Sequence, residues 1–572
     1  MSTSTKPWLA HYAPHVPVTV EVPDDDVTKA LWQSAAAFPD RKALDFMGSP
    51  TTYTELIALI DRAVVVLRDH GVSRGDRVAI ALPNTTAHVI AFYAVLRIGA
   101  VVVEHNPLYT QAELVHQLND SGAVCAIFWD RTAEELGSAL SQTGVESLLS
   151  VDVSQDLPLG KRLLLKLPVK KARETRQALC GTPPAAAQSW HAALAAVTSA
   201  PASSAVAQAD DLAVIQYTGG TTGAPKGAML THRNLVANTI QGAAWTGANE
   251  RQGTEIVYGV LPFFHAFGLT LCLTYSLRIG ATLILFPKFD VDSFCAAQKK
   301  DPGTFLPAVP PMLSRLVAHA AQKKVDLTSF RYAISGAMPL SRETAEAWEK
   351  TTGGLVIEGY GMTETSPVAL GSPLSNERKP GNLGLPFPST DALIVDQDDH
   401  TKVLPLTQRG ELLLAGPQIF QGYWNKPEET EHVLINRDGT TWIRTGDVVE
   451  MDEGGSFKVV DRIKEMIITG GFKVFPSQVE ERLREMPQIL DAAVVGIPGG
   501  DLGERVVAAL ILKDGVEAVT LEEVQDWCDK TMARYALPRE IYIVEDLPRS
   551  QIGKVLRRVV RDNILADKTK VQ

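Results

Sequence analysis

The stretch from Tyr217 to Gly227, with the sequence YTGGTTGAPKG, constrains the fold more than any other part of the chain. It is rich in glycine and threonine, contains Lys226, and directly follows the apolar run 212–215, which is typical of a short buried strand. Helical spacing follows it, at Leu230, Asn234, Leu235 and Asn238. Glycines let a loop bring backbone N–H groups close to phosphate, and hydroxyls and a lysine add donors and charge. The stretch is therefore predicted to be a polyphosphate-binding loop between a strand and a helix.

Spacing excludes two familiar phosphate-binding loops. A Walker A loop has glycine before its lysine and Ser or Thr after it, whereas Ala224-Pro225 precede Lys226 and Gly227 follows it. The dinucleotide pattern G-x-G-x-x-G is also missing from this loop. A flexible surface loop is the alternative, because clusters of Gly, Thr and Pro usually form one. The position directly after an apolar strand favours phosphate binding.

Length, charge and cysteine usage limit the class of protein. A chain of 572 residues exceeds a single hydrophobic core, so about two to four domains are expected. The net charge of −11 argues against nucleic acid as the main partner. The five cysteines are scattered without a C-x-x-C pair, which fits a reducing cytoplasm and predicts neither zinc nor disulfides. The sequence leaves monomer and homodimer open.

Neither the N-terminal segment nor the most apolar window of the sequence indicates a membrane-spanning protein. The N-terminus lacks the basic start and apolar core of a secretory signal. The least polar long window, 261–277, is slightly short for a membrane span and contains His265, so we expect it to be buried core. A soluble cytoplasmic protein is therefore expected.

Helical and strand patterns alternate along the chain, which is typical of an α/β protein. Amphipathic patterns alternate with apolar runs such as DRVAIALPN and AVVVEHNPL over about 27–129, and a second such series covers 256–398. From 382 to 461 short β segments are separated by Gly and Pro. We expect a large domain, 1–461, made of layered α/β subdomains and a small β-rich subdomain. A smaller α+β domain, 462–572, is expected to follow.

The segment 160–173 differs from its surroundings because basic residues alternate with leucines in it. Such a segment can lie on an anionic membrane surface. The favoured alternative is a solvated helix or loop whose leucines pack on the body of the protein. The corresponding hypothesis is that a cytoplasmic protein makes peripheral contact with a membrane through this segment.

Four further motifs carry residue types that a nucleotide site needs. EGYGMTETSP, at 358–367, offers an aromatic ring, glycines, hydroxyl donors and a carboxylate. RTGD, at 444–447, puts an aspartate in a turn where it can accept from ribose hydroxyls. DRIKE, at 461–465, and PRSQIGKVLRR, at 548–558, add an arginine and a lysine. Each alone is as well explained by an ordinary turn, hairpin or solvated basic run.

Together, in this order and spacing, the motifs resemble those of the adenylate-forming superfamily of acyl-CoA synthetases, luciferases and peptide-synthetase adenylation domains. The resemblance runs from about Thr51 to Arg558 and includes TYTEL, LPFFHAFGL, SGAMPL, GNLGLPFP and GELLLAGPQIFQGYWNKPEET. NPLYT, LPAVPPML and YGMTETSPV are most similar to medium- and long-chain fatty acyl-CoA ligases. The resemblance implies an enzyme that uses ATP, Mg²⁺ and coenzyme A. It would form acyl-AMP and pyrophosphate from a fatty acid, and then transfer the acyl group to CoA and release AMP.

The same resemblance assigns nucleotide contacts. The β- and γ-phosphates would be held by Thr218, Gly219, Gly220, Thr221, Thr222, Gly223 and Lys226. The adenine would be contacted by Gly336, Ala337, Met338, Glu358, Gly359, Tyr360, Gly361 and Met362, with Tyr360 stacking on the ring. Asp447 would accept from the ribose with Arg462 nearby. Glu364 would bind Mg²⁺, which prefers carboxylate plus phosphate oxygens.

Three residues are assigned to the chemistry. The first step brings an anionic carboxylate against an anionic α-phosphate, so it needs fixed positive charge and aimed donors. The resemblance gives this charge to Lys554, which would bridge the two groups, and gives Thr363 a contact with the α-phosphate. His265 would lie at the carboxylate end of the acyl pocket, although a lone histidine in an apolar stretch is usually a core residue.

In this family the last domain is mobile and turns about a residue that matches Lys464. The turn would withdraw Lys554 and present Gly470 and Gly471 to the pantetheine channel, with Lys473 near CoA or phosphate. A simple hairpin turn explains the two glycines equally well. Gly499 and Ala536 depart from residues common in the family, which puts contacts to the CoA phosphates in doubt, and the pair Glu104-His105 has no interpretation from sequence.

Two other functions remain open. A close rival is an acyl- or aryl-adenylating ligase that loads a carrier protein or makes an aryl-CoA. A non-catalytic lipid- or nucleotide-binding relative is the third possibility. Intact Lys226, Glu364, Asp447, Arg462 and Lys554 argue against it.

Overall fold

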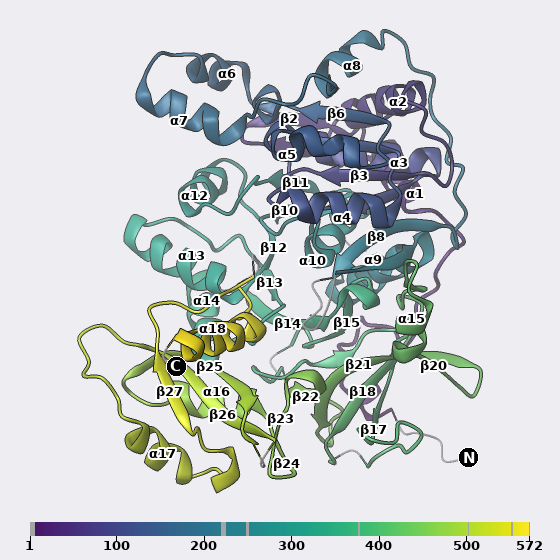
Figure 1. Ribbon diagram of the computed structural model, residues 1–572. Coiled ribbons are helices and arrows are strands. Elements are labelled where there is room, and N and C mark those ends of the chain that lie inside the picture. The colour runs from purple at the N-terminus through teal and green to yellow at the C-terminus, as the bar shows by residue number, and fades with distance from the viewer. Residues whose placement is uncertain are drawn as a thin grey trace.

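The computed structural model describes residues 6–218, 225–247, 251–375, 378–405, 407–500, 503–550 and 553–570. Figure 1 shows two α/β layers above a small β-sheet unit, with a separate small domain formed by the end of the chain. The expected fold class, a large α/β domain followed by a small α+β domain, is confirmed. The boundary between 461 and 462 stays a prediction.

The first large sheet has nine strands, and its central strands are parallel. Its order is β16(Leu385–Pro386), β15(Val368–Gly371), β14(Leu355–Gly361), β13(Tyr332–Ser335), β12(Phe305–Ala308), β10(Ile256–Gly259), β11(Thr282–Leu285), β1(Lys42–Phe46) and β2(Ser49–Thr52). Parallel strands need helical crossovers, which explains the helix–strand alternation of the sequence.

The second large sheet has eight strands and carries the glycine-rich loop. Its order is β19(Gly422–Tyr423), β9(Lys226–Thr231), β8(Leu212–Thr218), β4(Val101–Glu104), β3(Arg77–Ala81), β5(Cys125–Trp129), β6(Ser147–Val151) and β7(Gln188–Ser189). The loop joins β8 to β9. These two strands pair antiparallel, from Leu212↔Thr231 to Thr218↔Lys226. The prediction that the loop runs directly into a helix is therefore wrong, because six residues of strand come first and the helix starts only at His232.

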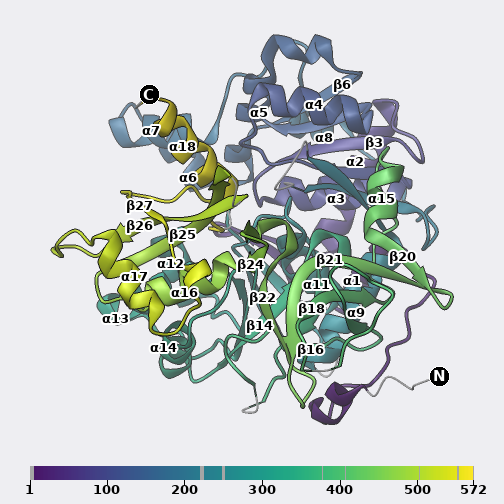
Figure 2. The ribbon, with the colours of Figure 1, turned by 60° about the horizontal axis from the view of Figure 1, so that its bottom comes forward.

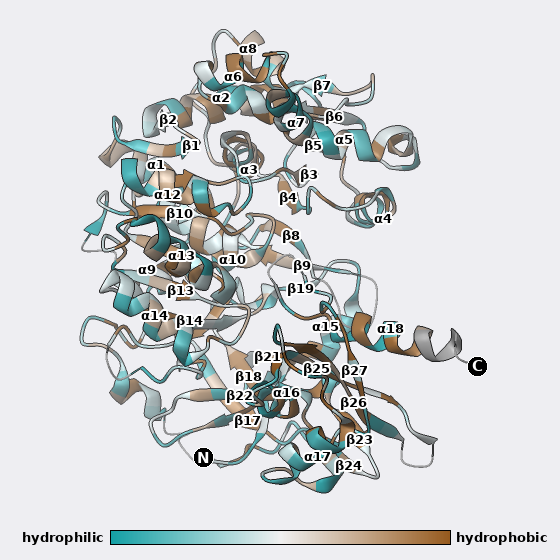
Figure 3. Cartoon of the chain, turned by 90° about the vertical axis from the view of Figure 1, so that its left-hand side faces the viewer, coloured by the Kyte–Doolittle hydropathy of each residue, from teal (hydrophilic) through white to brown (hydrophobic). Residues whose placement is uncertain are grey.

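Helices cover both sheets of the large domain, and Figure 3 shows many of them with a hydrophobic and a hydrophilic side. They are α1(Val27–Ala37), α2(Tyr53–Asp69), α3(Thr86–Ile98), α4(Gln111–Ser121), α5(Asp130–Leu136), α8(Trp190–Ala196), α9(His232–Thr246), α10(Ala266–Gly268), α11(Tyr275–Arg278), α12(Val291–Lys300), α13(Pro310–Lys323), α14(Arg342–Thr352) and α15(Pro427–Val433). Short helical turns are η1(Pro7–His11), η2(Gly137–Gln142), η3(Val153–Asp156), η5(Leu269–Thr274) and η6(Thr363–Thr365). The window 261–277 contains η5 and most of α11 and is largely buried, as predicted.

Local sequence signals fix the ends of α9, the helix beside the site. Thr231 caps its first turn by accepting from the Asn234 amide, and Gly247 ends it with φ of 64°. A hydroxyl N-cap and a left-handed glycine after the last turn are the usual stop signals of helices. Leu235, Val236, Ala243 and Trp245 of α9 belong to the continuous hydrophobic core that runs through both large sheets.

The small β unit has five strands, in agreement with the β-rich texture predicted for 382–461. They are β17(Asp391–Val395), β18(Gly410–Ala415), β21(Thr440–Met451), β20(Leu434–Arg437) and β22(Phe457–Arg462). Asp461 and Arg462 thus close the last strand of this unit. In Figures 1 and 2 the small domain lies beside β22.

The small domain is built on a three-stranded sheet with a separate core on each face. It contains β23(Ile467–Thr469), β24(Phe472–Val474), β25(Ile489–Pro498), β26(Glu504–Leu512), β27(Glu540–Ile543), α16(Pro476–Arg484), α17(Leu521–Asp529), α18(Arg557–Lys570) and the turns η7(Ile463–Glu465) and η9(Arg534–Ala536). Val494 belongs to the core under α16 and α17, and its neighbour Val495 to the core under α18. This alternation is the period of two expected of a strand buried on both faces.

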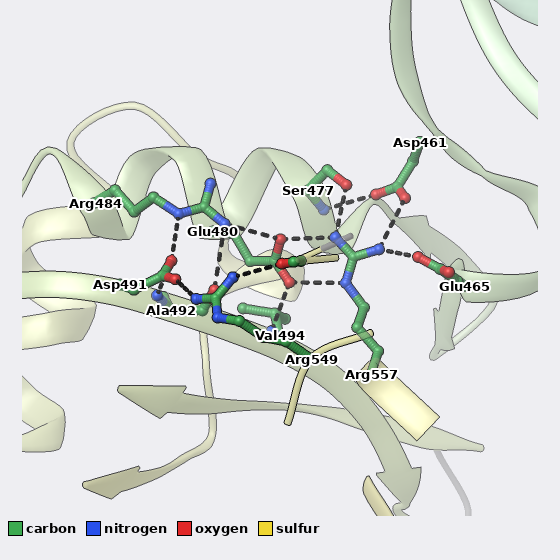
Figure 4. Close-up of polar contacts among 11 residues, drawn as sticks. Asp461, Glu465, Ser477, Glu480, Arg484, Asp491, Ala492, Val494, Arg549 and Arg557 are labelled. Atoms are coloured by element: carbon green, nitrogen blue, oxygen red, sulfur yellow. Dashed lines mark hydrogen bonds and ion pairs between the residues drawn. The ribbon is translucent and has the colours of Figure 1, made fainter. Parts of the chain in front are cut away.

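A network of carboxylates and arginines joins the small domain to the end of β22, as Figure 4 shows. We call Asp461, Glu465, Ser477, Glu480 and Arg557 the Arg557 cluster. Arg557 donates to both oxygens of Glu480, at 2.8 and 2.6 Å, and is also paired with Glu465. Asp461 accepts from the Ser477 amide at 2.7 Å and lies 3.8 Å from Arg557. This cluster spans the junction that the sequence places near 461.

The basic, leucine-rich segment forms two short helices, α6(Leu159–Leu165) and α7(Lys170–Leu179), which project from the large domain in Figure 1. Neither helix contains a buried residue. Leu159 is 69% exposed, Leu163 56% and Leu164 60%. The expectation that the leucines of this segment pack on the body is therefore wrong for Leu163 and Leu164, whereas Leu165 packs against the core. Among the described residues, no helix has both the length and the hydropathy needed to cross a bilayer.

Candidate active site

The predicted site residues gather where strands of both large sheets end. Ser335 ends β13 and is followed by Gly336, and β14 carries Glu358 to Gly361. β13 and β14 are parallel neighbours, with Ser335 opposite Glu358. Carboxyl ends of parallel strands meet at one edge of a sheet, where open α/β proteins bind ligands.

The flanks of the glycine-rich loop are held together by pairing of β8 with β9. Thr218 donates to the Lys226 carbonyl oxygen at 3.3 Å. The Lys226 ammonium pairs with Glu429 and lies 5.3 Å from the centre of the Tyr423 ring. Gly219, Gly220, Thr221, Thr222 and Gly223 lie outside the described residues, so their predicted phosphate contacts stay predictions.

Tyr360, Asp447, Arg462 and Lys554 form what we call the Asp447 cluster. Asp447 and Arg462 face each other across β21 and β22, and Arg462 Nε lies 3.0 Å from Asp447 Oδ1. Tyr360 donates its hydroxyl to the other oxygen, Oδ2, at 2.5 Å. Asp447 raises the pKa of the Arg462 guanidinium, and burial, followed by Asp447, raises the pKa of the Tyr360 hydroxyl. The Asp447 carboxylate, oriented by these two contacts, therefore lies beside the end of β14.

Lys554 reaches this cluster from the small domain. Gly553 packs so close to Met338 that a Cβ on it would lie 3.2 Å from the methionine sulfur. Burial and then the Arg462 charge lower the pKa of Lys554 to about 8, while Asp447 and Asp461 act in the opposite direction. Lys554 therefore lies within electrostatic range of Arg462 and Asp447, and its predicted place between the carboxylate and the α-phosphate stays a prediction.

Glu364 is the acidic residue predicted to hold magnesium. It lies in η6, is buried, and accepts a hydrogen bond from the Tyr423 hydroxyl at 2.6 Å. Burial raises the pKa of its carboxyl, opposed by the Tyr423 hydrogen bond and by Arg462 and Lys226. Among the described residues no group of three or more His, Cys, Asp or Glu could hold a metal by itself. One carboxylate fits Mg²⁺ only where phosphate oxygens complete the shell, and this donor set matches that arrangement.

The residues predicted beside adenine form one tightly packed wall. Ala337 has φ of 65°, and a Cβ on Gly336 would lie 3.0 Å from the Phe267 ring. A Cβ on Gly361 would lie 1.7 Å from the Pro367 carbonyl oxygen, so only glycine fits there. Glu358 accepts from the Gly381 amide at 2.6 Å, and burial raises the pKa of its carboxyl to about 7.

The rest of this wall is backbone. Gly359 pairs with Gly371 across β14 and β15. The Met362 amide is 3.0 Å from both the Thr365 hydroxyl and the Pro367 carbonyl oxygen. Thr363 opens η6 directly after Met362, and its predicted contact with the α-phosphate stays a prediction. These residues form the continuous turn after β14 in which Tyr360 and Glu364 are fixed.

His265 lies in the loop after β10, at the start of α10. Its Nδ1 accepts from the Phe267 amide at 3.3 Å, and burial lowers the pKa of its ring to about 4. The histidine is therefore neutral at ordinary pH. Gln216 of β8 donates to the Phe264 carbonyl oxygen at 3.0 Å, which ties this loop to the strand before the glycine-rich loop.

The residues predicted for the second step lie in the hairpin of β23 and β24. Gly470 and Gly471 form the hairpin turn between β23 and β24, with φ of 55° and 81°. Lys473 Nζ lies 3.3 Å from Asp398 Oδ2 and 3.3 Å from Gln397 Oε1, on a turn of the small β unit. Of the predicted residues that the structure describes, it thus brings Tyr360, Asp447, Arg462 and Lys554 together and places Lys473 beside Asp398.

Sequence reasoning missed several polar partners at the site. Tyr423 and Glu429, which contact Glu364 and Lys226, come from the motif GYWNKPEET, whose match to the family offered the only signal. Glu104 and His105 prove to be buried: Glu104 lies 3.0 Å from His88 Nε2, and His105 Nδ1 lies 2.8 Å from Gln117 Oε1.

Comparison with known proteins matches this arrangement. A sequence model described as AMP-binding enzyme matches residues 31–424, and one described as AMP-binding enzyme C-terminal domain matches 478–554. The chain is 38% identical to a long-chain-fatty-acid–CoA ligase of Bacillus subtilis (strain 168) over 97% of each chain. It is 35% identical to one of Escherichia coli O157:H7 over 97% of this chain and 98% of the other.

Solved structures are similar over nearly the same length. ATP-bound MatB from Rhodopseudomonas palustris superimposes with a TM-score of 0.78 at 28% identity, over 95% of this chain and 99% of the other. A fatty acyl CoA synthetase of Mycobacterium tuberculosis superimposes with a TM-score of 0.70 at 26% identity, also over 95% and 99%.

Proposed function

The chain belongs to the AMP-binding enzyme family, and on that premise we propose that it is an ATP-dependent fatty acyl-CoA synthetase. It is an acid–thiol ligase: it forms an acyl-adenylate and then transfers the acyl group to CoA. The observation that carries the proposal is the Asp447 cluster, in which a lysine from the small domain joins three residues of the large domain. The relatives are named long-chain-fatty-acid–CoA ligases, and we propose long- or medium-chain fatty acids as the substrates.

The first step joins two anions, and the site supplies charge to oppose their repulsion. A carboxylate oxygen attacks the α-phosphorus, the bond to the bridging oxygen breaks, and pyrophosphate leaves. Lys554, protonated below its pKa of about 8, would place one positive charge between the carboxylate and the α-phosphate. Thr363 would donate to the same phosphate, and neutral His265 would bound the carboxylate end of the pocket without adding charge.

The nucleotide would be oriented by groups that are already fixed. Asp447, held by Tyr360 and Arg462, would accept from the ribose hydroxyls, and the Tyr360 ring would face adenine beside the 336–338 turn. Lys226 and the glycine-rich loop would hold the β- and γ-phosphates. Glu364 would hold Mg²⁺ together with phosphate oxygens, and bound magnesium would neutralise charge on the departing pyrophosphate.

The second step would use the small domain differently. A thiol attacks the acyl carbon, the bond to the phosphate oxygen breaks, and AMP leaves. The small domain, 462–572, would turn about Lys464. This rotation would withdraw Lys554 and bring the Gly470-Gly471 turn and Lys473 to the opening of the pantetheine channel. Glycines there leave a clear path for the pantetheine arm.

AMP and pyrophosphate formation test this proposal across saturated acids from short to very long, with one aromatic acid, in the presence of free CoA. Steady turnover with free CoA and a clear dependence on chain length is the expected result. An aromatic acid that outperforms all fatty acids indicates an aryl-CoA ligase. Pyrophosphate release without turnover on CoA indicates loading of a carrier protein. No pyrophosphate from any acid indicates a non-catalytic binding relative.

The exposed side chains of α6 favour contact of this enzyme with a membrane surface, where it would meet its fatty acid substrate. Exposed Leu159, Leu163 and Leu164 lie among Lys161, Arg162 and Lys166. Exposed leucines beside basic side chains match the interface of an anionic bilayer. Co-sedimentation with phosphatidylglycerol vesicles tests this contact. Replacing the three leucines by asparagine should abolish binding, and equal binding of this variant and the wild type would contradict the contact.

A further inference from the structure

The ammonium of Lys226 is held by a carboxylate from a distant part of the chain. Lys226 begins β9, and its Nζ pairs with Glu429 of α15, which is 203 residues away in sequence. The Lys226 side chain is 22% exposed and that of Glu429 is 48% exposed. A lysine that binds the β- and γ-phosphates has to exchange this carboxylate for phosphate oxygens.

The backbone on both sides of this ion pair is fixed by one strand ladder. β19 pairs antiparallel with β9, and the Trp424 amide donates to the Gly227 carbonyl oxygen at 2.8 Å. The Thr430 hydroxyl accepts from the Tyr423 amide at 2.9 Å, which anchors the first turn of α15 to β19. The ion pair can therefore open by movement of its two side chains alone.

A second contact defines where the ammonium lies. Lys226 Nζ is 5.3 Å from the centre of the Tyr423 ring, and the hydroxyl of that ring donates to Glu364 at 2.6 Å. A cation over an aromatic face is attracted by the ring electrons. Lys226 is thus held by Glu429 and by the ring that also orients Glu364, the carboxylate assigned to magnesium.

We propose that Glu429 is the counter-ion of Lys226 in the empty site, and that it competes with polyphosphate for this lysine and so weakens the binding of pyrophosphate. The inference rests on the proposed function, because it concerns the lysine assigned to the β- and γ-phosphates. Ion pairs between partly exposed side chains are weak, whereas a polyphosphate offers the ammonium several charged oxygens. Lys226 leaves Glu429 when ATP binds and returns to it when pyrophosphate departs, so Glu429 acts as a positioning residue.

The surroundings of Glu429 keep this exchange reversible. The hydrogen bond from Lys226 lowers the pKa of the Glu429 carboxyl, burial opposes it, and the charges of Lys464 and His432 lower the pKa further. When Lys226 moves to phosphate, the half-exposed carboxylate thus keeps water and two other basic side chains near it. Because neither member of the pair is left buried and unpaired, opening it carries no large desolvation cost.

The test measures the Kd of magnesium pyrophosphate and of AMP by calorimetry on the whole chain, which needs no turnover. Glu429→Gln removes the competing charge, so it should lower the Kd of pyrophosphate by about two- to fivefold and leave that of AMP unchanged. Glu428→Gln removes the same charge from the preceding, exposed residue of α15 and should leave both constants close to wild type. Lys226→Met should raise the Kd of pyrophosphate and not that of AMP.

Four outcomes overturn the inference. Unchanged or weaker pyrophosphate binding in Glu429→Gln shows that the carboxylate does not compete for the lysine. An equal gain in Glu428→Gln shows a general effect of charge, and a parallel change in AMP binding shows an effect on the fold. Unchanged pyrophosphate binding in Lys226→Met removes the lysine from the phosphate site. Wild-type protein that releases pyrophosphate from no acid removes the proposed function, whereas active wild type with any of these four outcomes removes only this inference.

Discussion

The Asp447 cluster and the Arg557 cluster are both built from arginines and buried carboxylates, and they meet at adjacent residues of β22. Asp461 contacts Ser477 and Arg557, whereas its neighbour Arg462 contacts Asp447. The two differ in how completely their hydrogen-bonding groups are used. In the Arg557 cluster, Glu480 accepts from Arg557 on both oxygens and from the Val494 amide at 2.8 Å.

The Asp447 cluster, by contrast, retains unused capacity. Asp447 accepts one donor on each oxygen, and within the described part of the chain no side chain accepts from the Lys554 ammonium. A carboxylate oxygen has two lone pairs and an ammonium three protons, so both can take further partners. The difference teaches that a saturated ionic cluster holds a fold together, whereas a partly filled one is available for a ligand.

The largest expected effect is a loss of stability caused by a substitution in the Arg557 cluster. Arg557→Met should lower the free energy of unfolding of the small domain by about 3–5 kcal/mol, because Glu480 and Asp461 remain buried without their main cation. Burial already raises the pKa of the Glu480 carboxyl, with Arg484 and the Val494 amide opposing the rise. Urea denaturation checks the loss. The exposed neighbour Arg558→Met is the control and should change stability by less than about 0.5 kcal/mol.

The next largest effect is expected when the lysine charge is removed from the Asp447 cluster. Lys554→Ala should lower the rate of adenylate formation by about 10²- to 10³-fold, the usual cost of one group that stabilises developing negative charge. Turnover of supplied acyl-adenylate with CoA should remain nearly intact, and the melting temperature should change little. Lys458→Ala, an exposed lysine on β22, should leave both half-reactions unchanged. Equal losses in both half-reactions would contradict the role given to Lys554.

A smaller effect is expected from the carboxylate of the open cluster. Asp447→Asn keeps the shape and removes the charge, so it should raise KM for ATP by roughly ten- to a hundredfold, or about 1.5–3 kcal/mol. Stability should fall by much less, unlike in the Arg557 variant. Glu450→Gln, on the same strand but paired with Arg409, provides the matched control. A large loss of stability with an unchanged KM would reverse the comparison between the clusters.

The smallest effect is a pH dependence. Lysine carries its charge below its pKa, and burial beside Arg462 lowers the pKa of Lys554 to about 8. Above that pH the charge is lost, so kcat/KM for pyrophosphate release should fall about tenfold per pH unit. Lys554→Arg is less active but stays protonated, so its alkaline limb should disappear. A limb that persists in this variant belongs to another group.

Much of this arrangement could be predicted from sequence because its signals are local. The strand before the glycine-rich loop, the turn after β14 and the order of the motifs are all written in short runs of residues. Leu230 and Asn234 fall four apart, which favours helix, but Leu230 lies in β9 because this segment pairs with β8. Local periodicity cannot report such pairing.

Other features depend on contacts between distant parts of the chain. Glu429 lies about two hundred residues from Lys226, and Tyr12 is farther still from Trp245. No spacing rule connects such pairs. Apolar side chains are usually covered, so the exposure of Leu159, Leu163 and Leu164 follows from where α6 projects and not from the sequence.

The position of Asp461 has a consequence for the timing of the reaction cycle. Its carboxylate is attached to the large domain through β22, yet both of its outside partners, the Ser477 amide and Arg557, belong to the small domain. If the small domain turns about Lys464, as we propose, the contacts of Asp461 with Ser477 and Arg557 would break once in every cycle and form again before the next acid is activated. The strength of the contacts made by the Asp461 carboxylate would then set how long the small domain stays in place, so that it does not turn away before the adenylate is formed.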